Sequence, residues 1–305
     1  MTAPAGDLTL RHRREFRLPA LDSARFRNDL LVVALAGWVF GLIVWWNGTA
    51  GRLLPGDDLS AYLRAGHDLV LGAPVYVGQI GQAAAFSYAP PWAVAFAVLA
   101  WLPGPLLQLL MTALDLLALR YIVGGWRLMG LAFFYPVTVG VIISGNIEIL
   151  IAASLVLAAR GRSAPLVVMA FAKLSPVLGL RRSSWRSLVV VAAAGFLVTL
   201  PWLHLWPEWI AYLLRQPSAV PGLNILGPWY LRLPFALGLL ALRRPWASAL
   251  AAVVAMPSMW RGTLVVLLAP IRLWLDVSTH RRAARRLGGW VVMAKASTPL
   301  SPVPA

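Results

Sequence analysis

The chain has 305 residues, of which 60% are hydrophobic and only 12% are charged, and its mean hydropathy is +0.74. Soluble domains average about 45–50% apolar and about 25% charged residues, so this composition favours a protein in contact with lipid. The formal net charge is +16, but the basic residues separate apolar segments and do not line one polar face, which argues against nucleic-acid binding. The absence of cysteine excludes disulfides and cysteine-based metal sites, and four scattered histidines argue against a histidine-rich metal site.

The chain begins with a polar, basic tail over residues 1–28. The apolar run that follows is longer than the roughly 7–15 residues of a signal-peptide core, so it predicts a first membrane helix and not a cleaved signal. Continuing along the chain, apolar runs predict about ten spans in an all-α multi-pass membrane protein. They are Leu30–Trp46, Tyr88–Leu102, Leu106–Val123, Leu128–Ser144, Ile147–Ala159, Pro165–Leu180, Leu188–Leu203, Leu223–Leu242, Trp246–Met256 and Trp260–Leu275.

The distribution of basic residues predicts the orientation of these spans. With the N-terminal tail in the cytoplasm, most of the 27 lysines and arginines fall on the cytoplasmic side, so both termini are expected there, in the plasma membrane. The expected organisation is a tail at 1–28, one transmembrane domain at 29–276, and a second basic cytoplasmic tail at 277–305. The first external loop, 47–87, contains a predicted helix, Asp58–Leu71, lying on the outer leaflet.

The pair Asp57 and Asp58 follows a Pro-Gly turn and opens this helix. One interpretation is a helix N-cap, because acidic side chains stabilise the positive end of the helix dipole. The other is a general base at the membrane surface, which takes a proton from a sugar hydroxyl while its neighbour raises its pKa. The two interpretations are compatible.

Ionisable residues inside the apolar runs are the next candidates. Asp115 and Glu148 are costly in lipid, so they predict either pairing with Arg120, Lys173 or backbone groups, or a proton or ion path. Lys173, which precedes a proline, is expected either to reach the interface or to bind an anionic phosphate. Asn146 predicts a helix cap or a ligand donor.

The loop sequence GDDLSAYLRAGHDLVLGAPVY, followed by FSYAPPWAVAFAVLAWLP, resembles the opening of glycosyltransferase family 87, bacterial GT-C-type enzymes that use polyprenyl-phosphate sugars. The resemblance rests on Asp58, Tyr62, Gly72, Tyr76, Phe86, Tyr88, Pro90 and Pro91, and further on Gly145, Asn146, Lys173 and Pro176. It covers residues 29–180 and is strongest over 56–91. In the late segment, MPSMWRG at 256–262 carries Arg261 where the family has histidine.

The resemblance implies a GT-C-like bundle and an inverting glycosyltransferase related to the phosphatidylinositol mannoside mannosyltransferases. Asp58 would be the catalytic base, and the donor, with mannose as its expected sugar, would hand its sugar to a lipid-linked or cell-envelope glycan acceptor on the outer face. Lys173, Arg64 and Arg261 would bind the donor phosphate. The remaining candidate side chains would contact sugar or lipid; they are Asp57, Tyr62, Tyr88, Trp92, Asn146 and Glu148.

No cofactor is expected, and no metal is chemically obligatory, because polyprenyl phosphate leaves as a stable anion. The expected partners are the donor, the acceptor and membrane lipids; the oligomeric state is left open. Two alternatives remain: a transporter or flippase of a lipid-linked sugar, with Asp115 and Glu148 as coupling carboxylates, and a degenerate accessory protein on the same scaffold.

Overall fold

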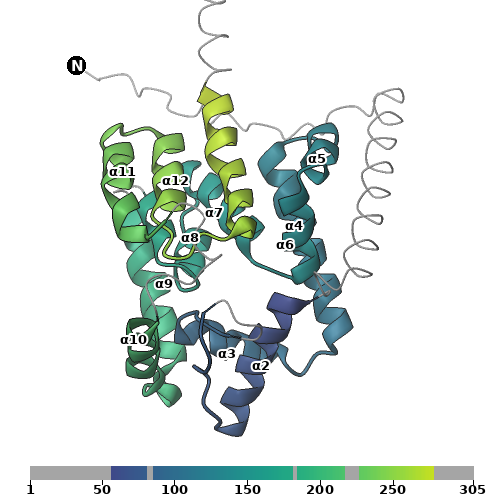
Figure 1. The fold of residues 1–305 in the computed structure, drawn as a ribbon, viewed down its shortest axis with the longest axis vertical. Helices are drawn as coiled ribbons and strands as arrows, with labels where there is room; N and C mark the ends of the chain where they lie inside the picture. Colours follow the sequence, from purple (N-terminus) through teal and green to yellow (C-terminus); the bar gives the residue numbers. More distant parts are fainter. Residues whose placement is uncertain (1–55, 81–84, 181–183, 217–226, 278–305) are drawn as a thin grey trace, which may run out of the picture.

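A computed structural model describes residues 56–80, 85–180, 184–216 and 227–277, and every element in these ranges is helical. The α-helices are α2 (Asp57–Leu71), α3 (Pro90–Leu99), α4 (Gly104–Val123), α5 (Trp126–Phe133), α6 (Pro136–Ser144), α7 (Glu148–Ala159), α8 (Ala164–Ala170), α9 (Trp185–Val198), α10 (Leu205–Arg215), α11 (Trp229–Ala241) and α12 (Pro245–Val254). The 3₁₀ helices are η1 (Ser175–Gly179), η3 (Leu200–Trp202) and η4 (Arg261–Leu267), and residues 268–277 form a further helix. At one end of the molecule lie α2, α3 and α10, whereas α11, α12 and the last helix lie at the other (Figure 1).

The prediction of ten membrane spans is wrong. Within the described ranges, only Gly104–Val123 has the length and hydropathy to cross a bilayer, and the bent pair Val137–Ser144 and Glu148–Ala159, which meet at 108°, would add one more if counted as a single span. A multi-pass plasma-membrane protein with cytoplasmic termini is therefore not supported. The first predicted span, Leu30–Trp46, and the two predicted tails up to residue 28 and from 278 onwards lie outside the described residues.

Proline helps to explain why the apolar runs do not become long helices. The run predicted as one span at 128–144 is divided before Pro136 into α5 and α6, and the run at 165–180 is divided into α8 and η1. Even α9, with 14 residues, is about 21 Å long, against a hydrocarbon core of about 30 Å. The apolar sequence folds instead as many short helices that pack on each other.

The centre of the fold is α7. Most of its 12 residues are buried, and its neighbours include α4, α8 and η4. A helix that is apolar on all sides is expected in the centre of a large core as well as in lipid. Apolar side chains also remain on the surface of α4 and α9, where Leu109, Leu117 and Val190 are exposed. The high hydropathy is thus divided between a buried core and an apolar exterior.

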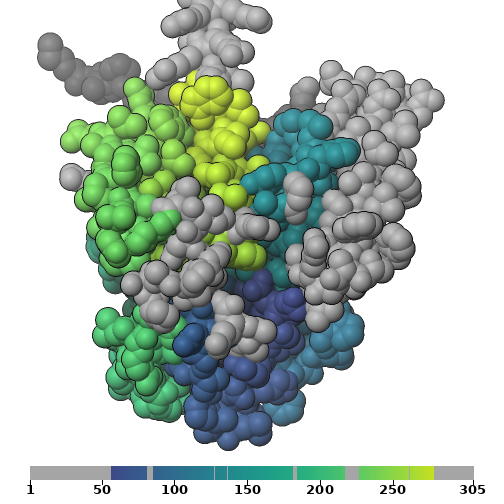
Figure 2. Space-filling view, in the orientation of Figure 1, coloured from purple at the N-terminus to yellow at the C-terminus, as the bar shows by residue number. Residues whose placement is uncertain are grey.

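The helix predicted at Asp58–Leu71 is confirmed as α2, and one side of it packs against the rest of the fold. It buries one face, including Leu59 and Leu69, and packs closely against α3. A Cβ atom on Gly66 would lie 2.5 Å from the backbone carbonyl of Phe96, so only glycine allows this approach. In the space-filling view, α2, α3 and α10 form one continuous end of the molecule (Figure 2).

Candidate functional site

The candidate site lies where the start of α2 meets the bend between α6 and α7. The backbone N–H of Gly56 donates to the carbonyl of Ile143 over 2.9 Å, which fixes the start of α2 against the end of α6. Gly145 ends α6 with φ of 70°, and a Cβ atom there would lie 2.9 Å from the Cβ of Leu59. A glycine at this bend therefore allows the α2 and α6–α7 backbones to come together.

Asn146 joins Asp58 to the start of α7. Its amide N–H donates to Oδ2 of Asp58 over 3.0 Å, and its side-chain oxygen accepts the backbone N–H of Glu148 over 3.1 Å. Of the two interpretations of Asn146 from the sequence, the structure shows the cap, because the side chain satisfies a free N–H at the helix start. The same side chain also orients the carboxylate of Asp58, whereas donation to a ligand stays a prediction.

Burial raises the pKa of the Asp58 carboxyl. Hydrogen bonding by Asn146 and Ser144 acts in the opposite direction, as does the positive charge of Lys173, whereas the negative charge of Glu148 raises the pKa further. Desolvation dominates, because the ionised carboxylate loses more stabilisation on leaving water than these partners supply. A carboxylate with a raised pKa is a better proton acceptor, as a general base requires.

Glu148 is fully buried and accepts three hydrogen bonds on the same oxygen, Oε1. The donors are the ammonium group of Lys173, the indole N–H of Trp260 over 3.2 Å and the hydroxyl of Thr263 over 3.0 Å. Its other oxygen, Oε2, is buried without a hydrogen-bond partner among the described residues. Of the alternatives predicted for Glu148, pairing with Lys173 is the one that the structure shows. We call Asp58, Asn146, Glu148, Lys173, Trp260 and Thr263 the carboxylate cluster.

The cluster carries two carboxylates and one ammonium group. It therefore binds an anionic phosphate only with the help of another cation. The backbone of Arg261 directly follows Trp260, a member of the cluster, whereas the side chain of Arg261 lies outside the described residues. Arg64 pairs with Asp68 at 3.7 Å. Burial raises the pKa of Tyr212 and the positive charge of Arg64 lowers it in part, so Arg64 lies on the side of α2 that faces α10.

The aromatic candidates form part of the core beside Asp58. The hydroxyl groups of Tyr62 and Tyr88 are hydrogen bonded at 2.8 Å, both rings are buried, and both pKa values are raised, mainly by burial. Trp92 stacks on Phe96 and donates its indole N–H to the carbonyl of Val168 over 3.2 Å. The buried rings of Tyr62 and Tyr88 support the start of α2, whereas Trp92 is only partly buried.

Two other candidates lie apart from these contacts. Asp57 is exposed in the first turn of α2, with the Ser60 hydroxyl bonded to its backbone carbonyl. Asp115 is buried within α4, and neither of its carboxylate oxygens has a hydrogen-bond partner among the described residues. Within the same ranges, no three His, Asp or Glu side chains are grouped in a way that would hold a metal ion.

Trp260 and Thr263 are members of the cluster that the sequence did not reveal. Thr263 is an isolated polar residue in an apolar segment, which is the only signal available for it.

Comparisons with protein families, curated proteins and solved structures find no match to this chain.

Proposed function

We propose that this protein is an inverting glycosyltransferase that moves a sugar from a polyprenyl-phosphate donor to a hydroxyl group of a glycan or lipid-linked acceptor. The observation that supports this most is the position of Asp58, whose partly buried carboxyl is oriented by Asn146 and lies beside the Glu148–Lys173 pair. A proton acceptor of raised pKa, fixed next to further polar groups, is what this reaction requires of the protein.

In the proposed reaction, Asp58 takes the proton of the acceptor hydroxyl while the oxygen of that hydroxyl attacks the anomeric carbon of the donor sugar. The bond between that carbon and the phosphate oxygen breaks, and the electron pair leaves with polyprenyl phosphate. Arg261, which follows Trp260 in the chain, would supply the further cation that the donor phosphate needs.

Translocation of a lipid-linked sugar is a weaker proposal. It requires a carboxylate that is released and recaptured, and Glu148 is held by three donors on two separate segments. The other coupling candidate, Asp115, lies on α4 and is not part of the carboxylate cluster.

If the chain is instead a degenerate accessory protein, it transfers no sugar at all. The transfer experiment described next therefore separates this alternative from the enzyme.

The test is an assay of the purified full-length chain with labelled polyprenyl-phosphate mannose and, separately, arabinose, offered to a lipid-linked mannoside acceptor. Loss of a positioned general base costs about 10²–10⁴-fold in rate, so Asp58→Asn is expected to lose at least a hundredfold. The matched control is Asp276→Asn, which also removes one carboxylate. Asp276 pairs with Arg160 at the far end of α7, about 18 Å from Glu148 along the helix.

Transfer by the wild type and by Asp276→Asn, together with its loss in a folded Asp58→Asn variant, supports the proposal. Full transfer by Asp58→Asn would remove Asp58 as the base. Absence of transfer from either donor by the wild type would reject the glycosyltransferase proposal.

A further inference from the structure

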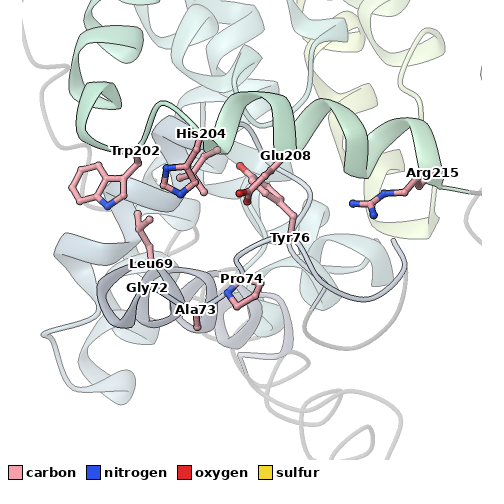
Figure 3. Close-up of a pocket in the computed structure, with 10 residues that line it drawn as sticks. Leu69, Gly72, Ala73, Pro74, Tyr76, Trp202, His204, Glu208 and Arg215 are labelled. Carbon is pink, nitrogen blue, oxygen red and sulfur yellow. The ribbon is translucent and has the colours of Figure 1, made fainter.

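A pocket lies at the opposite end of α2 from Asp58 and is separate from the carboxylate cluster. It has a volume of about 380 Å³ and is enclosed by the loop after α2 on one side and by η3 and α10 on the other. Figure 3 shows His204 and Glu208 on the α10 side, Tyr76 facing Glu208, and Leu69 next to Trp202. Leu69 follows Asp58 by 11 positions on the same helix, which places the two sites about 16 Å apart.

The walls of this pocket combine apolar faces with hydrogen-bonding groups. Leu69 and Trp202 supply apolar surface, and His204 and Glu208 supply exposed polar atoms. Tyr76 is held in place because its hydroxyl donates to the carbonyl of Tyr88 over 3.1 Å. A ligand that fits these walls has both an apolar face and several polar groups at its edge.

The charges in the pocket favour a neutral ligand. Glu208 and Arg215 lie two turns apart on α10 and balance each other formally, so neither an anion nor a cation meets a net opposite charge. A phosphate would meet the carboxylate of Glu208, and an ammonium group would meet the guanidinium of Arg215. Neutral saccharides, by contrast, place C–H faces on aromatic rings and donate hydroxyl protons to carboxylates.

We propose that this pocket binds a neutral saccharide, with Trp202 as the stacking platform and Glu208 as the hydroxyl acceptor. The choice of sugar as ligand rests in part on the proposed function, because a glycan acceptor is long enough to occupy a second site. Tyr76 connects the two sites, since its ring packs against Phe86, which in turn packs against Tyr62 next to Asp58. The pocket is a binding site and takes no part in the chemistry.

The experiment measures binding and not transfer. Methyl α-mannopyranoside and a linear α-linked mannotriose are titrated into the purified full-length chain, with saturation-transfer NMR for detection and calorimetry for the dissociation constant. Loss of a hydrogen bond to a charged acceptor weakens binding by about tenfold to a hundredfold, which is the effect expected of Glu208→Gln. Trp202→Ala is expected to weaken binding similarly. Trp185→Ala, which removes an exposed tryptophan on α9, is the matched control and retains binding.

Glu208→Gln preserves side-chain shape, so it tests the pocket even if Trp202→Ala fails to fold. Binding that survives Glu208→Gln unchanged, or no binding by the wild type, would overturn the proposal. Tighter binding of mannose 6-phosphate than of the neutral mannoside would overturn the ligand class. Asp58→Asn separates the two sites, because it should bind saccharide normally even though it loses transfer. If it alone loses binding, the sugar occupies the carboxylate cluster and binding at this pocket is rejected.

Discussion

Replacing Lys173 by methionine tests the ion pair at the centre of the carboxylate cluster. The change keeps most of the side-chain volume but leaves Glu148, whose side chain has no exposed surface, without its only charged partner among the described residues. Removing one partner of a buried ion pair costs about 3–5 kcal/mol, because the other charge stays buried without compensation. The bonds from Trp260 and Thr263 remain, so we expect the lower half of that range.

The partner substitution should be less damaging. In Glu148→Gln the amide oxygen still accepts from Trp260 and Thr263, and the side chain of Lys173 is 10% exposed, so its ammonium group has some access to water. The expected cost is that of a hydrogen bond lost from a charged group, about 1.5–3 kcal/mol. The double variant Lys173→Met/Glu148→Gln contains no uncompensated charge and should be more stable than Lys173→Met alone.

These energies are measured by urea unfolding of the purified chain, followed by far-ultraviolet circular dichroism, for the wild type, both single variants and the double variant. The four values form a double-mutant cycle that isolates the interaction of the pair. A cost of Lys173→Met below about 1 kcal/mol, which is typical of exposed pairs, would show that Glu148 is hydrated or protonated and would refute the reasoning.

Three further predictions use single substitutions. Burial raises the pKa of Asp58 above 3.8, so the stability that the neutral carboxyl contributes is fully present below pH 3.8 and is lost as the pH rises through the folded value. Asp58→Asn should therefore gain stability relative to the wild type as the pH is raised above 3.8 in urea titrations, and a difference that stays constant with pH would contradict the shift. Gly66→Ala places a methyl group 2.5 Å from the carbonyl of Phe96 and should lower the free energy of unfolding by about 1–3 kcal/mol in thermal or urea unfolding. Its control is Gly104→Ala, which meets no atom within 4 Å and should be close to neutral. Equal effects of the two substitutions would contradict the packing of α2 on α3. Arg232→Met removes the guanidinium that binds two carbonyls at the end of α12, so we expect a loss of about 1–3 kcal/mol by the same measurement, and an unchanged unfolding midpoint would contradict that role.

Local signals in the sequence were sufficient for some elements. The Pro-Gly turn before Asp57 and the glycine at position 72 bounded the first described helix to within one residue of its observed limits. The proline pair at 90–91 likewise marks the start of α3, where proline is favoured because its missing N–H has no partner there. These signals depend on a few neighbouring residues, and so they are visible without knowledge of the fold.

The architecture depended on information that apolar composition does not contain. A run such as α7 is apolar on every side, and this pattern is the same whether the surroundings are lipid or other helices. Only the arrangement of partners distinguishes the two, and this arrangement shows α7 enclosed by α4, α8 and η4. Reading every apolar run as a span therefore produced the wrong fold.

The candidate site was partly visible in the sequence for a similar reason. Asn146, Glu148 and Lys173 were identifiable because polar side chains in apolar runs need partners. They meet Asp58 because the chain bends after α6, and no local sequence pattern specifies the direction of that bend. Trp260 and Thr263 lie more than 80 residues after Lys173, so their bonds to Glu148 depend on tertiary structure alone.

The spacing of the three donors to Glu148 also determines when this site forms during synthesis. At about 5–20 residues per second, a ribosome needs about 4–17 s to extend the nascent chain from Lys173 to Trp260. Throughout that interval the growing polypeptide holds an acidic group in an apolar helix, with one of its three eventual partners available. Newly made α7 should therefore be protected by chaperones until the last quarter of the chain has been translated.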